Sequence, residues 1–571
     1  MELSVLSHDL HALPLGTQLA GAALVLFLSM LALRLFSNAC PGKAPPVEEG
    51  IPFVGGLIKF SKGPLPLMTE LYAKHGEAFT VPLLHKKMTF LIGPHVAPHF
   101  YNATDDKMSQ SEVYDFNVPT FGRGVVYDVD QRVRSEQFRW VANALQTTKL
   151  RSYVPAFKLE AEEYFSKWED EGVVDFMAVF SELIILTASR TLLGREIRES
   201  MFREVADLYH DLDDGMRPIS VIFPYLPTAF HRKRDAACAA LHAIFKKVIT
   251  SRRASAAKED DILQVLIDSR YRNVYGGRAT TDNEIAGLLI ALLFAGQHTS
   301  SVTSSWTGYR MLANPQWWKA SRPTPALDSC LHTCLYICPG SPAPQPSQQP
   351  LHLPTYRLLP TSTHHPFLSP HIPIHIHIHT LAGTPPSLPP LPAPLQAAQE
   401  EQRHVMAAHG DALDMDVLNG MNTLHLNIQE ALRMNPPLIM VMRLAKEAFP
   451  VTTSTGKTFV VPKGHIVAAS PTFAHRLPHI FKEPDEYQPD RYLPPREEDK
   501  PVKLSYVGFG GGRHACMGQN FAYLQIKTLW SVMLRNFEFE LLDPVPEPDY
   551  TSMVIGPKAC RVRYRRKKLV A

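Results

Sequence analysis

The stretch that decides the fold is FGGGRHACMG, residues 509–518, which places Cys516 in a glycine-rich loop. An apolar pattern with helical spacing follows at once, from Phe521 to Leu529. Close glycines let backbone N–H groups approach the sulfur, and the N-terminus of a helix favours a thiolate. We therefore expect Cys516 to be a metal-ligating cysteine. The alternative is a glycine-rich turn around a buried structural cysteine.

The same ten residues fit the pattern Phe-x-x-Gly-x-His/Arg-x-Cys-x-Gly and resemble the haem-binding loop of the cytochrome P-450 monooxygenases. In that family a cysteine thiolate ligates the haem iron and pushes electron density towards bound dioxygen. The resemblance implies the cytochrome P-450 fold, which is mainly α with small β-sheets. It also implies haem b as cofactor, with Cys516 as the axial ligand of the iron.

Composition limits the other classes of function. The 58 Lys+Arg nearly balance the 55 Asp+Glu, so charge does not argue for nucleic-acid binding. Hydrophobic residues make up 45% of the chain, which is ample for a large packed core. Seven cysteines in 571 residues are too sparse for a disulfide framework and suit a reducing compartment.

The N-terminus reads as a membrane anchor. Residues 19–33 (LAGAALVLFLSMLAL) carry no charge, and a run of this length suits a thin bilayer. The basic residues Arg34 and Lys43 follow the run, which places the rest of the chain on the cytoplasmic side. We expect a signal anchor over residues 1–36, and a cleaved signal peptide is the alternative. The Pro/Gly-rich residues 37–57 predict a stiff hinge.

Residues 58–571 are expected to form one catalytic domain that residues 321–394 interrupt. These 74 positions hold 18 prolines and eight histidines but only three charged residues. Such a density of prolines is incompatible with the regular spacing of apolar residues that marks a helix or a strand. We favour a disordered insertion, either untranslated sequence carried into the reading frame or a lineage-specific loop. A metal site is the weaker alternative. Its ligands would be Cys330, Cys334, Cys338, His375, His377 and His379.

A long helix is predicted from Asp282 to about Leu312, capped by Asp282 or Asn283. It is apolar on almost every side, which is typical of a buried central helix. The polar residues at 297–301 interrupt the apolar run and disfavour a second membrane span.

The centre of this helix, AGQHTS at residues 295–300, carries groups suited to oxygen chemistry. The hydroxyl of Thr299 can hold a water for proton delivery, and the imidazole of His298 can relay protons. The generic family pattern has an acid where this chain has His298. The alternative is a core histidine satisfied by a neighbouring carboxylate, for which Asp213 is the candidate.

A charged cluster is predicted on the helix from Asn422 to Met434. Glu430 and Arg433 lie three positions apart and share one face of it. With Arg491, they resemble the Glu-x-x-Arg plus Arg cluster that locks the haem-loop side of the P-450 fold. A buried pair of this kind must be well hydrogen-bonded to be tolerated.

Further motifs narrow the resemblance to the sterol 14α-demethylases. They are the loop YDFNVPTFGRGVVYD at residues 114–128, AGQHTS in the long helix, and His514 two positions before the cysteine in place of arginine. The resemblance implies haem propionate ligands at His514, Arg443, Tyr114 and Tyr127. It also implies a sterol pocket lined by Tyr114, Phe116, Phe121, Ala291, Phe294, Ala295, Leu438, Met440 and Met553.

The implied reaction removes the 14α-methyl group of a sterol in three oxidations. Each uses O2 and two electrons from NADPH, delivered by a separate NADPH–cytochrome P-450 reductase at the endoplasmic reticulum membrane. In the family, phenylalanine at the position of Phe116 goes with sterols that carry one C4 methyl, and the ring plausibly fills the space of a second methyl. We therefore expect obtusifoliol to be preferred over lanosterol.

Two alternatives remain for the function. One is a P-450 that hydroxylates another lipid, such as a fatty acid. The other is a non-catalytic haem- or sterol-binding protein that the insertion disables.

Two surface segments also invite a membrane role. The apolar residues 218–227 either dip into the bilayer as a substrate entrance or form ordinary core. The basic residues at 561–568 are either a solvated end or a contact for anionic lipid or an acidic reductase.

Overall fold

The computed structural model describes residues 42–48, 56, 58, 59, 63–83, 86–314 and 393–570. They belong to one compact unit, and the second unit, Trp318–Leu391, lies outside the described residues. The predicted anchor, most of the hinge and nearly all of the insertion also lie outside them.

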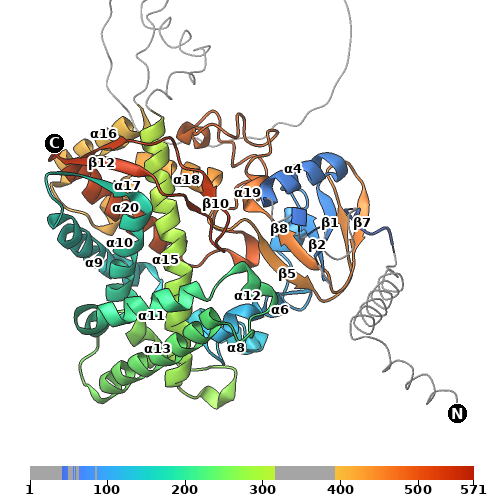
Figure 1. Cartoon of the computed structure of the whole chain (residues 1–571), viewed down its shortest axis with the longest axis horizontal. Coiled ribbons are helices and arrows are strands. Elements are labelled where there is room, and N and C mark those ends of the chain that lie inside the picture. The colour runs from blue at the N-terminus through green and yellow to red at the C-terminus, as the bar shows by residue number, and fades with distance from the viewer. Residues whose placement is uncertain are drawn as a thin grey trace, which may run out of the picture. The chain divides into compact units, whose positions relative to one another are not determined.

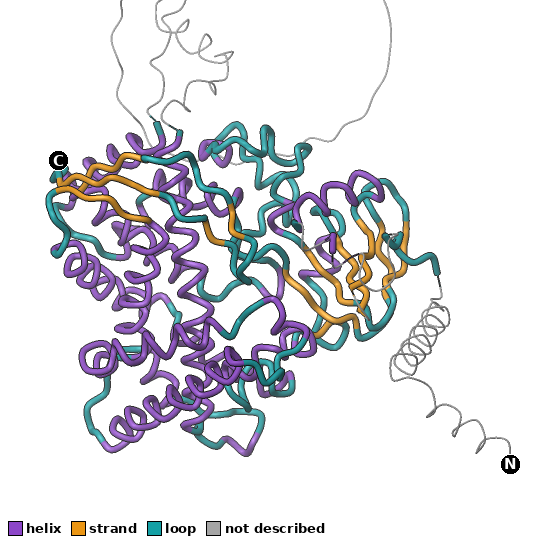
Figure 2. Tube along the Cα trace, viewed as in Figure 1, coloured by secondary structure: helices purple, strands orange, loops and turns teal. Residues whose placement is uncertain are grey.

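The described chain is mainly helical with small sheets, as predicted (Figures 1 and 2). Its α-helices are α4 (Pro64–His75), α5 (Ala97–Tyr101), α6 (Ser111–Tyr114), α7 (Val118–Phe121), α8 (Gln131–Ala144), α9 (Thr147–Ser166), α10 (Phe176–Ala188), α11 (Phe202–Asp214), α12 (Pro218–Ile222), α13 (Ala229–Ala254), α14 (Ile262–Asp268), α15 (Asp282–Ala313), α16 (Pro394–His409), α17 (Met415–Gly420), α18 (Asn422–Met434), α19 (Pro471–Ala474) and α20 (Gln519–Asn536). Short 3-10 or π turns are η1 (Asp115–Asn117), η2 (Ser189–Leu193), η3 (Ile197–Met201), η4 (Tyr275–Gly277), η6 (Pro489–Tyr492) and η7 (Gly512–His514).

The strands form four separate sheets. The largest follows the order β1-β2-β8-β5-β3, and the others are β4-β12-β9, β6-β7 and β10-β11. Their strands are β1 (Ala78–Leu83), β2 (Lys86–Leu91), β3 (Met108–Ser109), β4 (Glu171–Asp175), β5 (Val441–Ala445), β6 (Phe449–Thr452), β7 (Thr458–Val461), β8 (Ile466–Ala469), β9 (Phe537–Leu541), β10 (Pro548–Asp549), β11 (Gly556–Pro557) and β12 (Arg561–Arg566).

The largest sheet brings two distant parts of the chain together. Strand β8 runs parallel to β2 and antiparallel to β5, with Arg443 opposite Val467. Strand β3, which follows α5, closes the edge beside β5. The N-terminal strands and the segment after α18 therefore share one layer, and Arg443 is held on its central part.

Helix α15 is the central helix that the sequence predicts. It runs through the helical part of the fold and packs against α10, α13 and α18 (Figure 1). The predicted cap was wrong by one residue, because Thr281 rather than Asp282 or Asn283 caps it. Thr281 has extended backbone angles and accepts from the N–H of Glu284, whose carboxylate accepts from the N–H of Thr281 in return.

A close approach of backbone to α15 fixes the loop that carries several predicted site residues. A Cβ at Gly287 would lie 2.7 Å from the carbonyl oxygen of Phe121 and 2.8 Å from Val125. Only glycine leaves room for the loop to pack so tightly against the helix. The loop at 114–128 is therefore seated directly on α15.

Within the described residues, two helical stretches are long and apolar enough to cross a membrane. They are Phe176–Leu193 and Asp282–Ala313, and both are mostly buried inside the fold. Burial by protein explains their apolar character, as the sequence predicts for α15.

The basic C-terminal segment is strand β12, and its charges are paired. Arg561, Arg563 and Arg565 reach Asp543, Glu540 and Glu171 on or beside the neighbouring strands. Arg566 and Lys567 contact Asp170 and Glu538 in the same way. This cross-strand pairing removes the main argument for a role in binding anionic lipid, because little unpaired charge is left to attract it.

Candidate functional site

An open face in the middle of α15 marks the site. Ala291, Ala295 and Thr299, one turn apart from each other, are partly or fully exposed, although Leu293 and Ser300 beside them are buried. A strip of exposed small side chains inside an otherwise buried helix faces a space rather than a packed neighbour. All three residues belong to the predicted catalytic or sterol-lining set.

Aromatic rings join this helix to the loop at 114–128. Phe121 makes an edge contact with Phe294 on α15, with ring centres 5.8 Å apart. Tyr127 stacks on Tyr114 at 5.3 Å and on Phe121 at 6.3 Å, and Phe116 lies beside Tyr114. The structure therefore brings the predicted aromatic residues into one continuous wall.

Residues after α18 supply further predicted contacts. Leu438 is exposed and Met440 is half-buried, in the segment that leads into β5. The N–H of Ile555 donates to the carbonyl of Pro437 at 2.8 Å, which holds the turn containing the half-buried Met553 beside this segment. An exposed apolar side chain such as Leu438 is suited to contact with an apolar ligand.

Polar groups lie on and beside the open face of α15. The hydroxyl of Thr299 donates to the carbonyl of Ala295 at 2.7 Å, so its oxygen remains free to accept from a water. His298 Nε2 lies 2.9 Å from Asp213 Oδ1 on α11. The expected carboxylate partner of His298 is thus confirmed. Asp213 remains about one-third exposed, which places the pair between solvent and the helix.

Sequence reasoning missed Tyr209 on α11. Its ring lies 4.8 Å from that of Phe294 and 6.0 Å from that of His298, measured between ring centres. Burial raises the pKa of its hydroxyl strongly, and the charge of Asp213 adds to the rise. Tyr209 therefore remains a neutral hydrogen-bonding group. Its position four residues before Asp213 on one helix face was the only available signal.

The cysteine loop folds as the glycines require. Gly512 has a φ of +58°, and a Cβ there would lie 2.3 Å from the carbonyl oxygen of Tyr101. The loop therefore rests directly on the end of α5, and Cys516 follows at an exposed position before α20. The N–H groups of Gly518 and Gln519 point at the sulfur, as predicted.

The electrostatics of the thiol differ from the expectation. Although part of the Cys516 side chain is exposed, the protein packed around the thiol excludes enough water to raise its pKa, and the N–H groups of Gly518 and Gln519 only partly oppose this rise. The protein surroundings alone do not favour a thiolate. A bound metal ion deprotonates a coordinating thiol outright, so the charge would come with the metal.

Two arginines and His514 of the cysteine loop surround the carboxylate of Asp105. Arg443 and His514 both contact Asp105 Oδ1, each at 3.1 Å, and Arg134 on α8 lies 3.7 Å from the same oxygen. Arg443 is 1% exposed and Arg134 is 5% exposed. Burial, and then the charge of Arg443, lower the pKa of His514.

These residues fit the two propionate groups of a haem. Arg443 donates from Nη1 to the carbonyls of Phe100 and Ala103 and from Nη2 to Asp105 and the carbonyl of Met108. Its buried Nε has no protein partner among the described residues. A buried guanidinium N–H without a partner is costly unless a ligand supplies one.

Both predicted tyrosines are suitably placed for the same role. The hydroxyl of Tyr114 accepts from the N–H of Met442, the neighbour of Arg443, at 3.1 Å. Burial raises the pKa of Tyr114 and of Tyr127, so both remain neutral hydroxyl donors. Cys516, the cation cluster and the open face of α15 together suit a haem, which needs only one protein ligand to its iron.

The predicted Glu–Arg–Arg cluster is present and fully buried. Glu430 accepts from Arg433 at 2.8 and 2.9 Å and from Arg491 at 2.9 Å, and the hydroxyl of Tyr492 donates to it at 2.8 Å. Burial alone raises the pKa of the Glu430 carboxyl. Arg433 and Arg491 outweigh burial and hold the pKa below its ordinary value.

His475 connects this cluster to the segment that leads into the cysteine loop. The N–H of Val507 donates to His475 Nε2 at 2.8 Å, so Nδ1 carries the proton and faces the carbonyl of Arg433 at 3.2 Å. Burial lowers the pKa of His475 to about 3, and the neighbouring Arg433 contributes. The neutral ring therefore serves as a fixed bridge between α18 and the loop.

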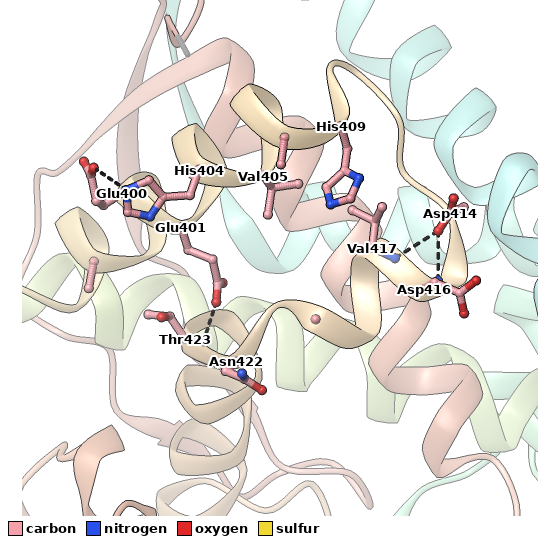
Figure 3. A pocket seen from close by; sticks show the side chains of 13 residues that line it. Glu400, Glu401, His404, Val405, His409, Asp414, Asp416, Val417, Asn422 and Thr423 are labelled. Atoms are coloured by element: carbon pink, nitrogen blue, oxygen red, sulfur yellow. Dashed lines mark hydrogen bonds and ion pairs between the residues drawn. The ribbon is translucent and has the colours of Figure 1, made fainter. Parts of the chain in front are cut away.

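A cavity of about 730 Å³ lies between α16, α17 and α18, away from these residues (Figure 3). Its polar lining includes Glu401, whose carboxylate accepts from the N–H groups of Thr423 and Leu424 and so caps α18 from outside. None of the predicted site residues lines it. Of its acidic side chains, Glu401 and Asp414 cap helix ends, and Glu400 and Asp416 pair with Arg403 and Arg151, which explains them without a ligand.

Comparison with known proteins identifies relatives of the whole chain. The family model described as Cytochrome P450 matches residues 45–322 and 392–562. "Obtusifoliol 14-alpha demethylase" of Sorghum bicolor is 48% identical, covering 98% of this chain and 99% of the relative. "Sterol 14-demethylase" of Arabidopsis thaliana is 46% identical over 95% and 96%. "Lanosterol 14-alpha demethylase" of Bos taurus is 35% identical over 97% and 96%.

A solved structure shares the fold. "Retinoic acid bound cyanobacterial CYP120A1" superposes with a TM-score of 0.68 at 18% identity, covering 92% of this chain and all of that one. At this identity the similarity shows only that the two chains share an arrangement of helices and sheets.

Proposed function

Because the chain belongs to the cytochrome P450 family, and within it to the sterol 14-demethylases, we propose that it removes the 14α-methyl group of obtusifoliol. The observation that carries this proposal is the 48% identity to a protein named for that reaction, across nearly the whole of both chains. Phe116 supports the choice of sterol. It is 3% exposed and its ring lies beside that of Tyr114, and in this proposal the ring occupies the space that a second C4 methyl group would need.

The cofactor is a haem whose iron Cys516 ligates. Arg443, His514, Tyr114 and Tyr127 would hold its propionates, and the Nε–H of Arg443, which has no hydrogen-bond partner among the described residues, would be available to them. When bound, the haem supplies activation of O2 with electrons that originate from NADPH and arrive through a separate reductase. The Glu430 cluster and His475 keep the cysteine loop in place for this role.

The protein's own part in the reaction is to orient the sterol and to deliver protons. Phe121, Phe294 and Leu438 offer apolar surface to a rigid polycycle. The Thr299 oxygen holds a water over the open face of α15, since its own proton is engaged with Ala295. Asp213 takes protons from solvent and passes them to His298 Nε2, 2.9 Å away.

The protein acts at the endoplasmic reticulum membrane, held by residues 1–36 with its catalytic domain towards the cytoplasm. A lipid-soluble substrate supports this placement. So does the exposed apolar surface at residues 219–226, where Phe223 is 50% and Leu226 is 41% exposed. A cavity of about 410 Å³ lies between Tyr225 of that surface and the segment 118–123, which carries Phe121.

A two-stage experiment tests the proposal. Reduced-CO difference spectroscopy on the purified full chain should show the shifted Soret band of a thiolate-ligated haem. Turnover of obtusifoliol with NADPH and a P-450 reductase should then yield the 14-desmethyl sterol and formate. A normal band without demethylated sterol would mean a different lipid substrate, and no band would mean no working haem site.

A further inference from the structure

Two arginines and a histidine of the proposed haem site converge on the carboxylate of Asp105, a residue that none of the sequence motifs includes. Asp105 Oδ1 lies 3.1 Å from Arg443 Nη2, 3.1 Å from His514 Nε2 and 3.7 Å from Arg134 Nη2. Its second oxygen accepts from the side chain of Gln131 at 3.3 Å. The Asp105 side chain is 16% exposed, so water screens these contacts only partly.

Asp105 links parts of the chain that are distant in sequence. It lies between α5 and β3, whereas Arg443 belongs to β5, Arg134 to α8 and His514 to the cysteine loop. The carbonyls of Phe100, Ala103 and Met108, on both sides of Asp105, also bind Arg443. The segment around Asp105 therefore surrounds the guanidinium and leaves its buried Nε without a hydrogen-bond partner among the described residues.

The charges do not balance within this cluster. Two guanidinium groups, Arg443 and Arg134, are permanently charged and share a single carboxylate. Nearly buried like charges repel strongly in a low-dielectric surrounding. The remaining positive charge suits an additional anion, and a haem carries two propionates.

We propose that Asp105 is a positioning residue for the haem: its carboxylate holds the side chains of Arg443, Arg134 and His514 in the places from which they would meet the propionates. The inference rests on the proposed haem site. It assigns Asp105 no contact with substrate or iron, and it adds Arg134 of α8 to the cations that Asp105 holds.

The test uses purified holoenzyme and two readouts, the rate of haem transfer to apomyoglobin and the haem reduction potential. In Asp105→Asn the cations lose their shared anion, and haem release should accelerate roughly tenfold, as expected for loss of one charge-assisted contact. Removing a negative charge near the iron should also move the potential to more positive values. Asp105→Glu keeps the charge and should restore both readouts.

A second variant gives an opposite sign. Arg134→Gln removes a positive charge from the same cluster, so haem release should again accelerate while the potential moves to more negative values. A residue that merely stabilises the fold would not produce shifts of opposite sign. If Asp105→Asn yields no holoprotein, Arg134→Gln still tests the proposal through the same two readouts.

The matched control is Asp106→Asn, which removes the same charge from an exposed neighbour and should leave both readouts at wild-type values. The proposal is overturned if Asp105→Asn releases haem no faster than wild type, or if neither variant moves the potential. A wild-type protein without a reduced-CO Soret band would instead contradict the haem site itself.

Discussion

At the scale of single residues, Glu430 has the most demanding surroundings. It is fully buried and binds two arginines, so its removal leaves Arg433 without a carboxylate partner among the described residues and Arg491 with Glu498 alone. We expect Glu430→Ala to lose about 3–5 kcal/mol of stability and to yield no holoprotein. The reduced-CO spectrum of the purified variant measures this directly.

The matched control is Glu204→Ala, which removes an exposed glutamate from α11 and should leave the spectrum unchanged. A normal thiolate-haem band in Glu430→Ala would show that the cluster is dispensable for haem binding.

Phe116 determines substrate choice in this account. Its ring is buried beside Tyr114, and in the proposed role it occupies the space of a second C4 methyl. We expect Phe116→Leu to raise the ratio of lanosterol to obtusifoliol turnover roughly tenfold, the usual scale for one or two methyl groups in a pocket. Obtusifoliol turnover in the same preparation is the internal control. Equal wild-type activity on both sterols would remove the basis for this role.

At the scale of elements, His475 bridges α18 and the segment before the cysteine loop, and this bridge makes stability depend on pH. Its pKa is about 3 in the folded protein, against about 6.5 for an unperturbed histidine. Above pH 6.5 both states are neutral and the histidine has no effect. As pH falls from 6.5 towards 3, only the unfolded chain takes up the proton, so stability falls by about 1.4 kcal/mol per pH unit.

Urea unfolding of the wild type and of His475→Gln at several pH values measures this dependence. The variant should be less stable at neutral pH, because it loses the bridge, but its stability should fall less steeply below pH 6.5. The exposed His404→Gln serves as control and should keep the wild-type slope. An unchanged slope in His475→Gln would contradict the bridge as the source.

The segment at 219–226 is an element whose sequence left two interpretations open, and its exposed apolar side chains favour the membrane over the core. In a chain shortened to begin after the predicted anchor, we expect Phe223→Ser with Leu226→Ser to weaken binding to lipid vesicles. Leu159→Ser, at an equally exposed leucine on α9, should not. Flotation with vesicles measures the difference, and equal binding by all three proteins would argue against this surface.

At the scale of the whole molecule, residues 321–394 interrupt the match to the family. The family match stops at residue 322 and resumes at 392, and α15 and α16 lie on either side. We expect deletion of 321–394 to preserve the reduced-CO spectrum and the melting temperature, because the remaining chain contains every residue of the proposed site. Loss of the haem band in the deletion variant would show that the segment contributes to folding.

Whether the native protein contains this segment is a separate question. Mass spectrometry of protein from its own cells decides it, since peptides from within 321–394 would exclude the interpretation as untranslated sequence.

Local patterns allowed much of this structure to be predicted. The bounds of α18 and the pairing of Glu430 with Arg433 follow from spacing within one helix, and the proposed role of Cys516 rests on ten consecutive residues. The cap of α15 was missed by one position because Asp, Asn and Thr all cap helices well.

Asp105 could not be found in this way. It lies 338 positions from Arg443. Only the sheet that pairs β3 with β5 brings the two residues together. Arg134 gave one weak signal, a charge on the buried face of an amphipathic helix. Contacts between distant segments depend on packing, and no local periodicity encodes them.

The most direct test of the central claim is the product formed from obtusifoliol by the purified full-length chain with NADPH and a P-450 reductase. Mass analysis of the sterol should show loss of the 14α-methyl group and a new ring double bond, with formate released in equal amount. Unchanged obtusifoliol, from a preparation with a normal reduced-CO band, would contradict the account.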